Sequence, residues 1–201
     1  VTHRTNIGFR NITTPQGASN GSVALGYQNS GSHALLLGSE NRENSTVHIG
    51  VGQTILAGNE NTVGSLFGIN GAIGYQNNNA GGTVEYVIGS QNKINHSEGN
   101  NLIFGGSNIS NDGAFNTLLG TANHIKAALN TNGNVILGRA NNTSGGTGMI
   151  KIGYNNNDYN NAQSNALINN GQTVAIGNQN RTQGLNITIG NLNNVSAQSS
   201  L

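Results

Sequence analysis

Residues that could carry out chemistry are sparse in this chain of 201 residues. It has 7 acidic residues, 8 Lys and Arg residues and no cysteine. A glycoside hydrolase needs two carboxyl groups about 5 to 10 Å apart, but Asp112 and Asp158 are the only aspartates and the glutamates stand at unrelated positions. The segments Gly81-Gly82-Thr83-Val84 and Gly145-Gly146-Thr147-Gly148 lack the aspartates of a calcium-binding roll repeat. We therefore expect no metal, no cofactor and no acid pair.

His124 is the most tempting candidate for a catalytic base. It would serve a left-handed β-helix acyltransferase, because the phrase Ile-Gly-x-x-Asn in this chain also fits the hexapeptide repeat of those trimeric enzymes. Several spacings between repeat glycines, such as that from Gly50 to Gly58, are not multiples of six and would lose the hexapeptide register again and again. A lone histidine in a loop is also more often a surface residue. We expect a protein that is not an enzyme and keep the acyltransferase as the less favoured alternative.

A glycine repeat dominates the sequence, and the structural elements that it specifies must position the other residues in space. An apolar residue precedes each repeat glycine, and Asn stands three residues after it, with Gln53 as the exception. Most spacings between successive glycines are too short for the two-helix units of helical arrays and suit a stack of short strands and turns. The repeat glycines are Gly8, Gly26, Gly38, Gly50, Gly58, Gly74, Gly89, Gly105, Gly120, Gly138, Gly153, Gly177 and Gly190.

Each repeat predicts one coil of a β-roll. A short strand ends at the glycine, where the backbone takes a positive φ. The asparagine then recurs at one level, so that its amide can bond the asparagines of the coils above and below. A second apolar spot, such as Val63 or Ile94, indicates a short return strand. We expect an all-β parallel β-roll solenoid of about 12–14 short coils, forming a single domain over residues 1–201.

The direction of the side chains leads to a prediction about assembly. We expect the residue before each glycine and the residue two positions earlier to point inward. The residue between them would then face outward, yet it is mostly apolar, and strands apolar on both faces are covered on both faces. Such a stripe predicts an oligomer with two-fold or three-fold symmetry. The interface is predicted at Ala24, Leu36, Leu56, Ala72, Val87, Ile103, Leu118, Ile136 and Ala175.

Composition excludes several classes of partner. Charged residues make up 7% of the chain and the formal net charge is +1, so we expect no binding to nucleic acid. No apolar run approaches the roughly 20 residues of a membrane helix. We therefore expect no direct insertion of this sequence into a membrane, and any anchor would have to lie elsewhere.

The phrases Ser22-Val23-Ala24-Leu25-Gly26 and Thr173-Val174-Ala175-Ile176-Gly177 resemble the head domains of trimeric autotransporter adhesins, the YadA-like family of Gram-negative bacteria. The resemblance covers nearly the whole chain. It implies a left-handed β-roll, a homotrimer packed through the outer apolar column, and display on the bacterial cell surface from the outer membrane. It also implies a host ligand, either an extracellular-matrix protein or a receptor of the carcinoembryonic-antigen-related adhesion molecule type.

Irregular segments of the repeat are the candidate receptor-binding sites, because regular positions build the stack while partner specificity resides in loops. An alternative of another class is a phage or structural trimeric fibre module that binds surface glycan. Exposed apolar or cationic side chains in these segments are candidate anchors. The predicted receptor-binding residues are Leu66, Phe67, Phe115, Lys126, Leu129 and Tyr159.

Overall fold

A computed structural model of the chain describes two compact units, one within Val1–Asn101 and one within Leu102–Leu201. Each described stretch contains one long strand and one short strand. The described residues contain no helix that is long and apolar enough to span a membrane. The stretches are 4–13, 22–31, 34–43, 53–64, 69–80, 84–95, 99–111, 113–125, 133–143, 147–158, 173–182 and 186–195.

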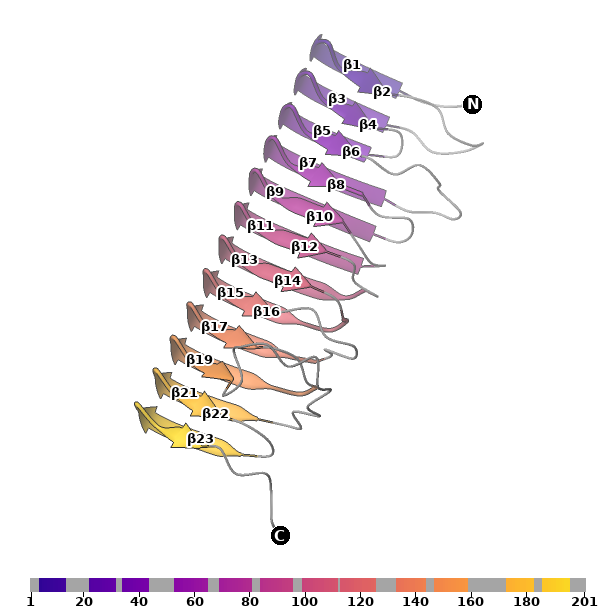
Figure 1. Ribbon diagram of the computed structural model, residues 1–201. Helices are drawn as coiled ribbons and strands as arrows, with labels where there is room; N and C mark the ends of the chain where they lie inside the picture. The colour runs from indigo at the N-terminus through magenta and orange to yellow at the C-terminus, as the bar shows by residue number, and fades with distance from the viewer. Residues whose placement is uncertain are drawn as a thin grey trace. The chain divides into compact units, whose positions relative to one another are not determined.

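Among the described residues of each unit, all the regular elements are strands, and a long odd-numbered strand alternates with a short even-numbered one (Figure 1). The first unit has β1 (Arg4–Phe9), β2 (Ile12–Thr13), β3 (Ser22–Tyr27), β4 (Ser30–Gly31), β5 (Ala34–Ser39), β6 (Arg42–Glu43), β7 (Gln53–Asn59), β8 (Thr62–Val63), β9 (Ile69–Tyr75), β10 (Asn78–Ala80), β11 (Val84–Ser90) and β12 (Lys93–Asn95).

The second unit repeats this alternation. Its strands are β13 (Asn101–Gly106), β14 (Ile109–Asn111), β15 (Thr117–Thr121), β16 (His124–Ile125), β17 (Val135–Arg139), β18 (Asn142–Thr143), β19 (Ile150–Tyr154), β20 (Asn157–Asp158), β21 (Val174–Asn178), β22 (Arg181–Thr182), β23 (Ile187–Asn191) and β24 (Asn194–Val195).

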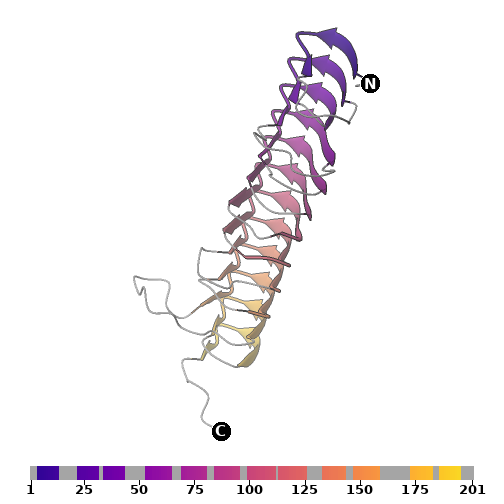
Figure 2. The same cartoon turned by 90° about the vertical axis from the view of Figure 1, so that its right-hand side faces the viewer.

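Parallel pairing of strands from successive coils makes two sheets in each unit. In the first unit, the long strands pair in chain order from β1 to β11, and the short strands pair from β2 to β12. The second unit pairs β13 through β23 and β14 through β24 in the same way. The two sheets face each other across the interior of the coils (Figure 2). The predicted all-β parallel solenoid is thus confirmed within each unit.

The repeat glycines are held in register from coil to coil. Their φ angles lie between +109° and +126°, which confirms the predicted positive φ. The close approach of neighbouring coils adds a second requirement, because a Cβ on Gly26 would lie 1.9 Å from the carbonyl oxygen of Gly38. Gly38 pairs directly with Gly58, and Gly50 lies outside the described residues. Only glycine satisfies both the backbone angle and the coil spacing.

The asparagine ladder that the repeat predicts is present in both units. Asn41 is typical: its Nδ2 donates to Asn29 Oδ1 at 3.0 Å, to the Leu37 carbonyl at 3.0 Å and to the Gly58 carbonyl at 2.9 Å. Its Oδ1 accepts bonds from the backbone N and Nδ2 of Asn61. Each ladder asparagine therefore joins three successive coils at a buried turn whose backbone groups would otherwise be unsatisfied.

The interior of the described coils holds the column predicted to face outward. The residue two positions before the glycine packs inside, as Leu36, Leu56 and Ala72 do beside Val63 of the short-strand sheet. The predicted direction of the side chains is therefore wrong. Alternation along a strand groups residues onto two faces, but it does not say which apolar face is the inner one. The nine predicted interface residues, each 0% exposed within the single chain, are Ala24, Leu36, Leu56, Ala72, Val87, Ile103, Leu118, Ile136 and Ala175.

Candidate interaction surfaces

The outer face of the long-strand sheet carries the apolar side chains that were expected inside. We use the term outer face for the residues one and three positions before each repeat glycine. In the first unit, four of these side chains within the stack keep more than a third of their surface in contact with solvent: Leu35 37%, Ile55 38%, Ile73 42% and Tyr86 38%. Others, such as Leu25 and Leu37, are half-buried. Successive coils pair in register, so these side chains form a continuous stripe. A stripe of this kind exceeds the scattered apolar residues of an ordinary protein surface.

The second unit has the same outer face. Phe104 is 38% exposed, and Ile150 and Ile152 are each 37% exposed. In the last described coil, Ile187 and Ile189 rise to 74% and 69%. The outer face is thus a property of the repeat and recurs in both units.

Aromatic residues border the outer face at the position just after the repeat glycine. In the first unit, the rings of Phe9 and Tyr27 stack with their centroids 5.8 Å apart, and the Arg10 guanidinium lies 5.0 Å from the centre of the Phe9 ring. In the second unit, Arg139 lies 5.9 Å from the ring centre of Tyr154. These contacts fix large side chains along one margin of the face.

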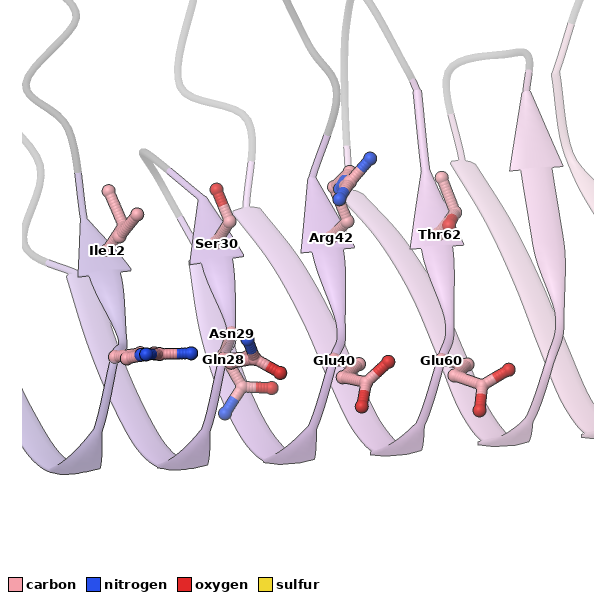
Figure 3. Close-up of a pocket in the computed structure, with 9 residues that line it drawn as sticks. Ile12, Gln28, Asn29, Ser30, Glu40, Arg42, Glu60 and Thr62 are labelled. Atoms are coloured by element: carbon pink, nitrogen blue, oxygen red, sulfur yellow. The ribbon is translucent and has the colours of Figure 1, made fainter.

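A polar groove of about 830 Å³ runs along the first unit, on the side of the short strands. One wall is the turn row, made of the residues two positions after the glycines: Arg10, Gln28, Glu40 and Glu60. The other wall is the short-strand row, made of the residues four positions after the glycines: Ile12, Ser30, Arg42 and Thr62. Figure 3 shows the Gln28, Glu40 and Glu60 side chains following one another along the turns, with Ser30, Arg42 and Thr62 on the short strands.

The turn row is held in an unusual backbone conformation. Arg10, Gln28, Glu40 and Glu60 all have φ between 53° and 56°, a left-handed conformation that costs a non-glycine residue about 1 to 2 kcal/mol. Backbone bonds between coils hold it, as when Gln28 N donates to the Phe9 carbonyl at 2.9 Å. This backbone conformation directs each side chain of the turn row outward at the equivalent place in its coil, so that the side chains line up as one wall.

A smaller groove of about 370 Å³ occupies the equivalent place in the second unit. Its walls include Asn155 and Gln179 from the turns and Asn157 and Arg181 from the short strands. Carboxamides replace the carboxylates of the first unit. The groove is therefore built by the repeat, and its chemistry varies with the side chains placed on a constant backbone.

Comparisons of the chain with protein-family models, with curated proteins and with solved structures found no match. The fold and the two surfaces are therefore the basis for any functional assignment.

Most of the predicted receptor-binding residues fall outside the described part of the chain. These are Leu66, Phe67, Lys126, Leu129 and Tyr159. Phe115 is described, and its side chain is 63% exposed at a bend where its φ is 59°. An exposed aromatic ring on a strained bend is a suitable anchor for a protein partner.

Residues with catalytic potential are not gathered into a site among the described residues. His124 is half-buried on β16, with Nε2 3.0 Å from Nδ2 of Asn111. Asp112 lies outside the described residues, as does the side chain of Asp158. Within the described stretches, no group of three or more His, Cys, Asp or Glu residues could hold a metal ion.

Sequence reasoning missed a set of polar side chains inside the coils. Lys151 and Glu85 are each 0% exposed. The Lys151 ammonium donates to the Asn142 carbonyl, and Glu85 Oε1 accepts from Asn101 Nδ2 at 3.1 Å. The sequence signal for these buried residues was the alternation of side chains along each strand. Both residues occupy the inward-pointing positions, which can be recognised once the inner face of the strand is known. The hydrogen bonds of these two side chains satisfy buried polar groups and so contribute to the fold.

Proposed function

We propose that this chain is a non-enzymatic adhesin head that assembles as a homotrimer through its outer face. In this proposal it is displayed from the outer membrane of a Gram-negative bacterium and binds a host protein. The single observation that carries the proposal is the stripe of exposed aliphatic and aromatic side chains along the outer face of each unit. Water-exposed stripes of this kind are typical of surfaces that associate.

An assembly of identical copies accounts for this stripe better than a small ligand does. The outer face repeats coil by coil, and a second copy carries the same repeat, so that like levels can meet about a symmetry axis. The likeness of the repeat to YadA-like heads favours three-fold over two-fold symmetry and a left-handed roll. The interface in this proposal consists of side chains such as Leu35, Ile55 and Ile152, instead of the column first expected.

The oligomeric state tests the interface directly. We expect the purified chain to have three times its chain mass of 20.7 kDa in solution. Ile55→Lys and Ile152→Lys, one in each unit, should give folded monomers because an ammonium group would have to be buried in the interface. Light scattering coupled to gel filtration measures the mass, and circular dichroism checks the fold.

Asn78→Lys is the matched control, since it adds the same charge to an exposed position of the short-strand sheet. It should leave the trimer intact. A wild-type chain that is monomeric at micromolar concentration would contradict the proposed interface.

Receptor binding provides the test of the adhesin function. We expect the trimer to bind at least one member of a panel that includes collagen, fibronectin, laminin and the ectodomain of a carcinoembryonic-antigen-related adhesion molecule. Phe115→Ala should weaken that binding by about tenfold or more, as loss of an aromatic anchor does. Surface plasmon resonance measures the dissociation constants.

Leu192→Ala serves as the control for Phe115→Ala. Leu192 is 73% exposed and shares the φ of 59°, so both changes remove an exposed apolar side chain from the same backbone conformation. Equal losses in the two variants would place the binding site away from Phe115, and failure of the trimer to bind any panel member would argue against the adhesin proposal.

A further inference from the structure

The groove of the first unit carries acidic and basic side chains on its walls. Glu40 and Arg42 line it, and among the described residues neither side chain makes a hydrogen bond or ion pair. Glu60 is held in place, because its two carboxylate oxygens accept from Asn59 Nδ2 at 3.3 Å and from Gln76 Nε2 at 2.6 Å. The groove therefore combines one oriented carboxylate with a carboxylate and a guanidinium that no described side chain engages.

The floor of the groove offers little to a ligand. Asn29 Nδ2 already donates to Asn11 Oδ1, to the Leu25 carbonyl and to the Gly38 carbonyl. Its Oδ1 accepts two bonds from Asn41. Of the short strands below the groove, β4, β6 and β8 are paired on both sides within the stack, whereas β2 pairs only with β4. Recognition must therefore come from the side chains of the two walls.

These walls select against an extended peptide and against a polyanion. A peptide that binds by adding a strand needs an unpaired sheet edge, and one that binds by its side chains needs apolar pockets. The strands β4, β6 and β8 are paired on both sides, and Ile12 is the only apolar side chain among the described lining residues. A polyanion would meet the carboxylates of Glu40 and Glu60, which face the same way in the turn row (Figure 3).

The walls match the hydroxyl groups of a neutral sugar. A hydroxyl group both donates and accepts, so it can donate to a carboxylate of the turn row and accept from Arg42 or Gln28. The two acidic and two cationic lining residues leave the groove with no net charge. Successive coils repeat the two walls at the parallel-strand spacing of about 4.8 Å, so that a linear chain along the stack meets one turn-row and one short-strand-row side chain at each step, although their types differ between coils.

We propose that this groove binds a neutral linear oligosaccharide that lies along the stack of coils. The site belongs to a single chain and does not depend on the trimer. A monomeric mass in solution would therefore overturn the proposed interface and leave this proposal standing.

Binding to immobilised glycans tests the proposal. The probes are cellohexaose, maltohexaose, chitohexaose and a neutral lactosamine hexasaccharide, with a heparin hexasaccharide and an extended-peptide library as comparators. We expect the full chain to bind at least one neutral probe, with an affinity that changes little with salt because no ion pair forms. Glu40→Gln and Arg42→Gln should each weaken binding roughly tenfold, through loss of a charge-assisted hydrogen bond.

Arg139→Gln is the matched control, because it makes the same substitution at an exposed arginine of the second unit. It should bind the neutral probe like the wild type, and circular dichroism should show all three variants folded. The proposal is overturned if no neutral probe binds, if only the heparin or peptide probes bind, or if Arg139→Gln loses as much affinity as Arg42→Gln.

Discussion

Asn123→Asp is expected to lower the free energy of unfolding of the second unit by at least about 4 kcal/mol. Asn123 is 0% exposed, and its Nδ2 donates to Asn108 Oδ1 at 3.1 Å, to the Leu119 carbonyl at 3.3 Å and to the Gly138 carbonyl at 2.9 Å. In the Asp variant, a carboxylate oxygen would replace this Nδ2 donor and would face the same three acceptor oxygens without a hydrogen to donate. Asn108 Oδ1 would still accept from the backbone N of Asn123 at 3.0 Å, but a buried carbonyl that loses its donor costs about 1 to 3 kcal/mol, with more for a charged group.

The other half of the ladder contact would survive this change, which isolates the effect of the lost donor. Asn123 Oδ1 accepts from the backbone N and Nδ2 of Asn141, both at 3.1 Å, and a carboxylate oxygen can accept the same two bonds. The loss therefore comes from donors aimed at coil carbonyls, together with burial of a charge. Chemical denaturation followed by circular dichroism measures it.

Asn178→Asp is the control for this experiment. Asn178 is exposed on β21, so that the same substitution there should change the free energy of unfolding by less than about 0.5 kcal/mol. Comparable losses in the two variants would mean that added negative charge, and not the ladder, is responsible.

The local structure of a coil could be predicted from the sequence because its causes are local. A glycine at a fixed place, followed three residues later by asparagine, predicts the strand end, the turn and the stacked amides. Gly120 and Asn123 occupy these places in the structure. The close approach of coils at the glycines was not predicted, because it depends on the register between neighbouring coils: a Cβ on Gly120 would meet the backbone of Gly138.

The direction of the side chains could not be decided from alternation alone, because both faces of the long strands are apolar. Aromatic side chains were the missing criterion. Tyr86 and Phe104 are 38% exposed on the outer face, whereas the described residues of the inner column are aliphatic or polar, as Ala24, Leu36 and Ile103 are. Close packing in the interior leaves no gap that a larger ring could fill. The apolar stripe and the inference of association survive the reversal, but the residues that form the stripe change.

The grooves were beyond sequence reasoning for a different reason. Their walls join positions two and four residues after the glycine, on either side of the ladder asparagine. The repeat pattern alone does not show that side chains at these two positions line the same groove. The left-handed backbone conformation of the turn residue decides it. Glu40 and Glu60 are well separated in the chain, yet they lie on adjacent coils, since Gly38 pairs with Gly58. The stacking of coils therefore brings residues that are distant in sequence together in one wall of the groove.

Gly120→Ala is expected to lower the free energy of unfolding of the second unit by about 3 kcal/mol or more. The new Cβ would lie 1.9 Å from the carbonyl oxygen of Gly138 and 2.9 Å from its carbonyl carbon, where ordinary contact begins at 3.4 Å. Overpacking of this kind costs about 1 to 3 kcal/mol or more. The φ of +121° adds backbone strain of about 1 to 3 kcal/mol. Thermal and chemical denaturation measure the loss.

Gly133→Ala separates the two contributions to the loss at Gly120. Gly133 also has a positive φ, +69°, but the nearest atom to a Cβ there is Gly148 N at 4.0 Å. Its loss should be about 1 to 2 kcal/mol, from the left-handed backbone alone. A loss at Gly120 no larger than this would contradict the steric role assigned to the glycine column.

The two largest effects should not add, because they act on the same atom. The Gly138 carbonyl oxygen accepts the bond from Asn123 Nδ2 and is also the atom that a Cβ at position 120 would strike. A coil displaced by Gly120→Ala has already lost much of that bond, so Asn123→Asp should cost less in the double variant than in the wild type. A double-mutant cycle measures this coupling. Strict additivity would mean that glycine and asparagine stabilise the stack independently, whereas the shared carbonyl requires that they act as one unit.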